Sequence, residues 1–307
     1  MPAGLRRLAL STALTMLVSL SSNDASASES WDRLLWKSIE LREKGQFAES
    51  LKFANESLAA VDGANDKHLP EVLTQIGRIH SEQAHHAEAE PYFARALEVS
   101  ERLHGKTSPR LDADLMYLAG NHVSKNELAT AETLYLRLLK IIEGARGPQH
   151  VDLALPLRAM AHLHRRQGRM QDAERAIKRT MTLWQSPSAT VLGVKFDGTP
   201  QDLQNLGALH ADRGSFEDAI RVHEQALKLL DQDLEASREK WGSPGNGTFA
   251  RSIECLERLA RLSRRVGRSD AADGYEGRAK ALRSQMTGEP LLSSPRTWAQ
   301  GLLEIAM

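Results

Sequence analysis

The chain has 307 residues and carries 40 basic and 40 acidic side chains, so its formal net charge is zero. A nucleic-acid-binding domain is usually strongly basic, and this balance disfavours that class of partner. Aromatic residues make up only 5% of the chain while Ala, Leu, Arg and Glu are frequent, which favours helices over strands.

The N-terminal segment has the three parts of a secretory signal peptide. Arg6 and Arg7 form a positive region, residues 8–20 are an apolar run, and residues 25–27 read Ala-Ser-Ala, a small-residue cleavage pattern. The apolar run is shorter than the roughly 20 residues that a membrane-spanning helix needs. We therefore expect residues 1–27 to be removed and the mature chain to be exported to the periplasm or secreted, without stable membrane insertion. An uncleaved anchor and an organelle transit peptide are the alternatives.

A histidine returns at nearly constant spacing through the middle of the chain. His80, His122 and His164 are 42 residues apart, and His210 follows 46 residues later. Each has large apolar residues seven and four positions before it and Gly or Ala three positions before it, which are offsets of one helical face. Such a ladder could be a metal site, a proton relay, or one architectural position copied in successive helices.

A second helical block follows each of these helices after a short turn. Five of the six blocks open with Gly or Asn, which favours a left-handed turn between two helices. The sixth position of every block is small, so the paired helices can approach closely there; these positions are Ser50, Ala89, Ala131, Ala173, Ala219 and Ala272. The pattern predicts helix–turn–helix repeats near 31–62, 70–104, 109–146, 151–184, 200–240 and 249–286.

The repeat resembles the tetratricopeptide repeat, whose form is W-x2-L-G-x2-Y, then A-x3-F, then P. His replaces the Tyr here, and no copy keeps the Trp. The 42-residue period and the linker GPQHVDLALPL, which starts at Gly147, are similar to the kinesin-light-chain type of the repeat, with Val151 where Pro is usual. The resemblance covers roughly residues 31–285. It implies an all-α, right-handed superhelical solenoid of about six repeats, whose concave groove binds peptides.

The resemblance also implies that each histidine of the ladder packs inside its helical pair. Histidines of neighbouring repeats would then lie roughly 10 Å apart, the spacing of packed helices. Because metal–nitrogen bonds are about 2 Å long, successive histidines cannot share an ion. We therefore interpret the ladder as structural.

Three segments interrupt the repeats. Residues 185–201 contain two Pro and two Gly, which predicts a loop or linker. An unusually long helix at about 217–240 precedes a second predicted loop at 242–248. Residues 287–307 follow the last repeat as a tail or a short capping helix, so we expect the solenoid to span 28–286.

The motifs of enzymes are missing or incomplete. The fragment HGKTS at 104–108 lacks the upstream Gly of a phosphate loop, and HHAEAE at 85–90 lacks the HExxH pattern. Cys255 is the single cysteine, so an intrachain disulfide is impossible, and its place in a predicted helix is typical of a buried, inert thiol. We predict that the protein is not an enzyme and has no catalytic residue, metal or cofactor.

The candidate binding surface is the face of each first helix that points away from its packing residues. By the resemblance, this face lines the concave groove, which is apolar at the third repeat and basic at the fourth and sixth. We predict that the peptide-binding residues are Met116, Arg158, His162, Arg165, Arg166, Arg261, Arg264 and Arg265. The planar guanidinium of arginine can donate two hydrogen bonds to one carboxylate, so the ligand would be an acidic peptide or a C-terminal carboxylate.

The sequence therefore predicts an exported scaffold that binds a protein or peptide partner, and not nucleic acid. Two other classes stay open. One is an enzyme or enzyme-accessory subunit that uses His162 or the arginines. The other is a module that associates with itself by stacking its terminal repeats. The arginines could also be solvated charges that pair with neighbouring acids and contribute little.

The predicted signal peptide can be tested by N-terminal sequencing of the exported chain. We expect the sequence to begin at Ser28, because the small residues at positions 25 and 27 place the cleavage site after Ala27. Replacing Ala25 and Ala27 with Arg should block cleavage. A parent chain that stays inside the cell with Met1 intact would show that the interpretation is wrong.

Overall fold

The computed structural model describes residues 30–61, 67–191, 194–195, 198–241 and 246–286. The predicted signal peptide and the predicted tail after residue 286 lie outside the described residues. Within these ranges, no helix combines the length and the hydrophobicity that a membrane crossing requires.

Six helical pairs follow one another along the described chain. They are α2 (Trp31–Glu43) with α3 (Phe47–Val61), α4 (Leu69–Glu82) with α5 (His86–His104), α6 (Asp112–Ser124) with α7 (Leu128–Arg146), α8 (Ala154–Arg166) with α9 (Met170–Leu183), α10 (Thr199–Asp212) with α11 (Phe216–Trp241), and α12 (Asn246–Arg265) with α13 (Ser269–Gln285). Short 3-10 helices, η1 (Pro109–Leu111) and η2 (Val151–Leu153), precede α6 and α8.

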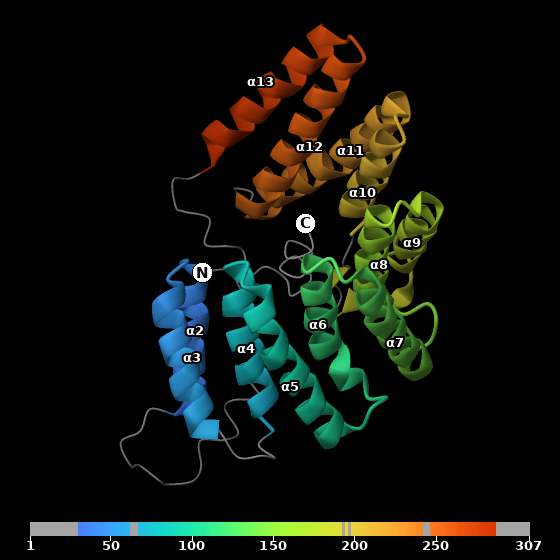
Figure 1. The fold of residues 1–307 in the computed structure, drawn as a ribbon. Helices are drawn as coiled ribbons and strands as arrows, with labels where there is room; N and C mark the ends of the chain where they lie inside the picture. The colour runs from blue at the N-terminus through green and yellow to red at the C-terminus, as the bar shows by residue number, and fades with distance from the viewer. Residues whose placement is uncertain (1–29, 62–66, 192–193, 196–197, 242–245, 287–307) are drawn as a thin grey trace.

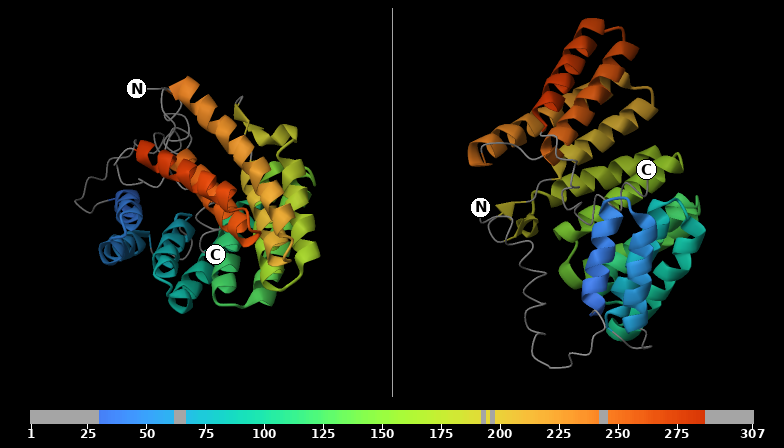
Figure 2. Two further views of the ribbon diagram at one scale, coloured as in Figure 1. Left: turned by 90° about the horizontal axis from the view of Figure 1, so that it is seen from above. Right: turned by 90° about the vertical axis from the view of Figure 1, so that its left-hand side faces the viewer.

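The pairs stack side by side along a curved path. Figure 1 shows this path running from α2 and α3 to α8 and α9, and then turning upward through α10 to α13. The view from above in Figure 2 shows that the last repeats come round over the first ones. The predicted fold, an all-α right-handed superhelical solenoid of helix–turn–helix repeats, is confirmed.

Every pair is closed by the same turn. The second residue after each first helix has a left-handed backbone, with φ between 61° and 80°, at Gly45, Ala84, Asn126, Gly168, Gly214 and Gly267. The next amide donates to the carbonyl five residues earlier, as in a Schellman motif; in the third repeat, Glu127 N lies 2.8 Å from His122 O. The left-handed backbone conformation therefore explains the Gly and Asn residues in this column. Ala84 adopts the same conformation, although its Cβ makes that conformation less favourable than it is for Gly.

The helices of each pair touch at the small residues that the sequence picked out. All six residues of that column, from Ser50 to Ala272, have no exposed surface. The first packing leucine of each repeat faces the same interface and is also buried; these are Leu34, Leu73, Leu115, Leu157, Leu203 and Leu256. Each repeat thus buries its apolar face against its own second helix and its neighbours, as expected for a solenoid.

The two predicted loops are shorter in the structure than in the sequence prediction. Part of the 185–201 segment is ordered as the 3-10 helix η3 (Pro187–Ala189) and an antiparallel hairpin of β1 (Thr190–Val191) and β2 (Val194–Lys195). Pro200 lies in the first turn of α10, where a missing amide hydrogen costs nothing. Likewise α12 begins at Asn246, within the 242–248 segment. The prediction of plain loops over both complete segments was therefore wrong.

A buried ion pair joins the fourth repeat to the fifth. Arg158 on α8 donates through Nε to Oδ1 of Asp202 on α10 at 2.7 Å, and the indole Nε1 of Trp184 donates to Oδ2 at 2.7 Å. Arg158 and Asp202 are 6% and 0% exposed. The guanidinium carbon also lies 5.7 Å from the centre of the Trp184 ring. Both carboxylate oxygens are therefore satisfied, which a buried charge requires.

Replacing Asp202 with Ala should lower the free energy of unfolding by about 3–5 kcal/mol, because the buried Arg158 charge is then left without its partner. Denaturant unfolding followed by circular dichroism measures the effect. The control is Arg158→Met combined with Asp202→Leu, which removes both charges and should recover most of the loss. An unchanged unfolding midpoint for Asp202→Ala would show that the ion pair does not hold this joint.

Candidate functional site

A groove in the described part of the chain lies inside the curvature of the solenoid. Its volume is about 1020 Å³, and its walls come from residues as far apart in sequence as His86 and Arg265. The groove is lined by His86, Ser124, His162, Arg165, Arg166, Ala208, Ala211, Asp212, His223, Arg258, Arg261, Leu262 and Arg265. Five of these residues are arginines and one is a carboxylate, so the lining is strongly basic.

The structure brings five of the eight sequence-predicted residues together in this groove. Arg165 and Arg166 are at the end of α8 beside His162, and Arg261 and Arg265 lie on α12. These residues share helical offsets relative to the first packing leucine of their repeats. Helical periodicity therefore identified residues that line one groove, while their role in peptide binding stays a prediction.

Met116 and Arg158 do not lie on an open surface, and the prediction that they face the groove is corrected. Each is 6% exposed. They follow the first packing leucine of their repeat by one position, and this column is covered by the first helix of the next repeat. Thr74, in the same column, lies 3.5 Å from Oδ1 of Asp114, just as Arg158 contacts Asp202 two joints further on. A residue that is exposed on an isolated pair becomes buried when the pairs stack.

Arg264 is exposed but does not line the groove. Its guanidinium donates to both oxygens of Glu276 and, at 3.1 Å, to Oδ1 of Asp273, and both partners lie on α13. Arg264 therefore joins the two helices of the last repeat, and its charge is already compensated.

Two arginines of the groove are compensated by carboxylates and three are not. Arg165 pairs with Asp212, and Arg258 with Glu254 at 2.5 Å. The remaining three arginines have no carboxylate partner among the described residues. Arg166 donates to the Val123 carbonyl at 2.7 Å and to Asn126 Oδ1 at 3.0 Å, both neutral acceptors.

The other two uncompensated arginines belong to the last repeat. The guanidinium carbon of Arg265 lies 4.3 Å from the centre of the Phe216 ring, a cation–π contact that holds the side chain and keeps its charge. Arg261 is exposed in the groove. We call Arg166, Arg261 and Arg265 the open arginines. They leave about three positive charges facing the groove.

Two histidines lie deeper in the groove and are kept neutral. Burial, followed by the charges of Arg165 and Arg166, lowers the pKa of His162 to about 4. Burial, followed by the charge of Arg258, lowers the pKa of His223 to about 4. The Nδ1 atom of each ring is enclosed without a hydrogen-bond partner in the described structure.

His223 and Arg258 were missed by the sequence analysis. Arg258 lies outside the helical offsets that define the predicted face, and His223 is on the second helix of its repeat. The position of His223 is occupied by Phe93, Tyr135 and Ile177 in the three preceding repeats. An imidazole among apolar residues at one repeat position was the signal that could have revealed it.

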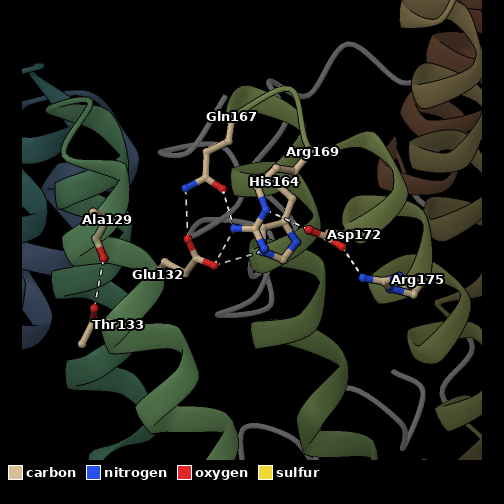
Figure 3. A network of polar contacts seen from close by, with 8 residues as sticks. All are labelled: Ala129, Glu132, Thr133, His164, Gln167, Arg169, Asp172 and Arg175. Carbon is tan, nitrogen blue, oxygen red and sulfur yellow. Dashed lines mark hydrogen bonds and ion pairs between the residues drawn. The ribbon is translucent and has the colours of Figure 1, made fainter.

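The histidine ladder, by contrast, makes contacts at the joints between helices. His122 Nδ1 lies 2.6 Å from Glu127 Oε2, and the ring of His80 stacks on Tyr92 with 5.6 Å between ring centres. Figure 3 shows the environment of His164, whose Nε2 lies 3.4 Å from an oxygen of Glu132. These are separate local contacts, and they agree with the structural interpretation of the ladder.

Near the ladder, a recurring clamp joins one repeat to the next. The turn after a first helix supplies a cation to a glutamate on the second helix of the preceding repeat. The pairs are Lys125–Glu90, Arg169–Glu132 and Arg213–Glu174. In the second clamp, Gln167 also donates to Glu132 at 3.1 Å (Figure 3). Hydrogen bonds from Lys178 and Arg213 lower the pKa of Glu174 to about 2, so this clamp stays charged in mild acid.

The first clamp includes the one group in the described ranges whose side chains converge as metal ligands could. Glu90, His122 and Glu127 offer atoms within 4.8 Å of one another. The ammonium of Lys125, however, contacts Glu90 and lies 2.7 Å from Glu127. A cation would have to displace this lysine, so we interpret the cluster as an ion-pair network.

Cys255 is completely buried behind the groove. Its Sγ lies 3.4 Å from the carbonyl oxygen of His223, and burial raises the pKa of the thiol to about 12. Because the thiolate is the nucleophilic form, this cysteine is inert at neutral pH.

Comparison with known proteins gives the same repeat architecture. Models of the tetratricopeptide repeat match residues 38–102, 111–186 and 203–237. No curated protein sequence matches this chain.

Solved structures share the fold at low sequence identity. BtubC (BKLC) from P. vanneervenii aligns with a TM-score of 0.57 and 18% identity, over 86% of this chain and 94% of that one. Nearly identical kinesin-light-chain TPR-like repeats from Podosopora anserina give 0.52 and 14%, over 71% and 97%. The pilF protein of Pseudomonas aeruginosa gives 0.50 and 13%, over 87% and 96%. These likenesses establish the fold alone.

Replacing His223 with Phe should make the stability less sensitive to acid. The pKa of about 4 in the folded chain compares with about 6.5 for an unfolded histidine. Between these values only the unfolded state takes up the proton, so the parent loses stability as the pH falls. From pH 7 to pH 5 we expect this loss to be about 1–2 kcal/mol larger in the parent than in the variant. Urea unfolding at both pH values measures it, and equal losses would contradict the expectation.

Proposed function

The chain belongs to the tetratricopeptide repeat family, and from that premise we propose that it is an exported protein–protein interaction scaffold that binds an acidic segment of its partner. The segment lies in the groove between α8 and α12. The observation that carries the proposal is the set of open arginines, Arg166, Arg261 and Arg265, in a groove whose lining includes a single carboxylate. Export rests on the sequence of residues 1–27.

The groove suits carboxylates for both electrostatic and geometric reasons. A guanidinium presents paired N–H donors that match the two oxygens of a carboxylate. Arg265 is held against Phe216 and Arg166 against Val123 and Asn126, so less side-chain freedom is lost when a ligand binds. An acidic ligand would replace weakly held water with charge-assisted hydrogen bonds.

A scaffold is favoured over an enzyme by the chemistry of the same groove. Acid–base or nucleophilic catalysis needs an activated group within hydrogen-bond reach of the reacting atoms. The groove's carboxylate, Asp212, is paired with Arg165, and the imidazoles of His162 and His223 are neutral without a carboxylate to orient them in the described structure. This arrangement is suited to recognising a ligand, and neither His162 nor His223 has, among the described residues, the carboxylate partner that would orient it as a general base.

Replacing Arg261 and Arg265 with Glu should weaken the binding of a fluorescein-labelled peptide that carries four glutamates. We expect the Kd to rise at least about tenfold, because two attractive contacts become repulsive. Binding by the parent should also weaken as the salt concentration rises from about 50 to about 300 mM. Attraction between exposed charges is screened over about 10 Å at 0.1 M salt. Fluorescence anisotropy gives both quantities.

The matched control is Arg175→Glu combined with Arg221→Glu, which makes the same charge change at exposed sites on the second helices α9 and α11. This control should bind the peptide as the parent does. Equal affinities for the groove variant and the parent, with both folded by circular dichroism, would remove the basic groove as the binding site.

A further inference from the structure

His223, in the groove lining, is an imidazole at a repeat position that Phe93, Tyr135 and Ile177 occupy in the three preceding repeats. His223 is 1% exposed, and its Nδ1 is enclosed without a partner. An unpaired buried nitrogen costs free energy that Phe or Ile would not incur at this place. Gly207 makes room for the ring, because a Cβ on Gly207 would lie 2.7 Å from its Nε2. His80 and His164 have the same enclosed nitrogen but lie at joints between helices, whereas His223 is part of the groove lining, where a ligand can approach it.

A second ring with an unsatisfied nitrogen lines the same groove. His162 on α8 also has an enclosed Nδ1 without a partner, and it is part of the groove lining together with His223 on α11. A neutral imidazole has one donor and one acceptor nitrogen. Burial keeps both rings neutral, so each is suited to an uncharged polar partner and not to a carboxylate.

Between the two basic walls, the groove has a floor of small residues. Ala208 and Ala211 on α10 line it between Arg166 on α8 and the open arginines of α12. Two methyl groups leave room for a peptide backbone to approach the helix closely. The floor thus separates the cations into two groups, one from the fourth repeat and one from the sixth.

We propose that the groove recognises a peptide with two separated acidic groups, and that His162 and His223 form hydrogen bonds with the main chain between them. The proposal rests on the proposed function and defines its ligand. The two arginine walls hold the acidic ends, the alanine floor admits an uncharged stretch of small residues, and the imidazoles bind its amide and carbonyl groups.

The geometry sets the spacing of the acidic groups. The walls belong to alternate repeats, so their helix axes lie roughly two packing distances apart, about 16–20 Å. An extended chain rises about 3.3 Å per residue. Because the arginine side chains reach inward from both walls, about three to five residues separate the two acidic groups.

Two labelled peptides of equal composition and charge test the proposal. The split peptide is Glu-Glu-Ala-Gly-Ala-Glu-Glu, and the clustered peptide is Ala-Gly-Ala-Glu-Glu-Glu-Glu. We expect the split peptide to bind the full-length chain about tenfold more tightly by fluorescence anisotropy, since it alone can reach both walls and the histidines. Methylating the three central amide nitrogens of the split peptide should abolish this advantage.

The role of His223 is tested with two substitutions. His223→Phe restores the side chain of the second repeat and should weaken the binding of the split peptide about tenfold, to the affinity of the clustered peptide. His223→Gln keeps a donor and an acceptor and should retain part of the preference. Thermal melts show that both variants are folded.

The outcomes separate the two proposals. If neither peptide binds the parent chain, the proposed function is wrong. If both bind equally well, the acidic groove stands and the two-site recognition is overturned. An unchanged preference in His223→Phe would also overturn it, because the base of the groove would then make no contact with the ligand.

Discussion

Close contact between two helices at one small residue per repeat is the constraint on which the molecule depends. Because this residue is enclosed in all six repeats, each pair can form a shared apolar interface over its whole length. The left-handed turn fixes the direction in which the second helix returns. With both fixed, every pair forms the same kind of unit, and stacking these units side by side produces the superhelix and its inner groove.

The sequence was sufficient to predict what recurs within a repeat. The leucine positions, the small column and the turn residues are local features that recur in each repeat. Six copies of a pattern that is weak in any one repeat together support the same repeat assignment. The sequence pattern did not predict which residues of one repeat are covered by the next repeat. Arg158 belongs to the exposed face of an isolated helix, and only the stacked helix α10, with Asp202 on it, makes it part of the interior.

The same distinction explains which site residues were found. Arg261 and Arg265 were found because they lie at outward-facing helical offsets. Their neighbour Arg264 instead forms ion pairs with two carboxylates on α13. Periodicity also drew attention to the histidines that recur, and these form local joints between helices. One of the histidines that line the groove, His223, breaks the pattern at its position. In a repeat protein, the recurring residues define the scaffold, and departures from the recurrence are better indicators of a site.

The clamps between repeats also determine how the solenoid responds to force. Glutamates at one position of the second helix join the second, third and fourth repeats to their successors, whereas Leu51 and Ile220 occupy that position in the first and fifth repeats. Ion pairs yield to added salt and apolar contacts do not. The first and last joints have ion pairs at other positions, Arg42–Glu82 and Arg278–Asp231. The resistance of the solenoid to bending therefore falls along its whole described length as ionic strength rises.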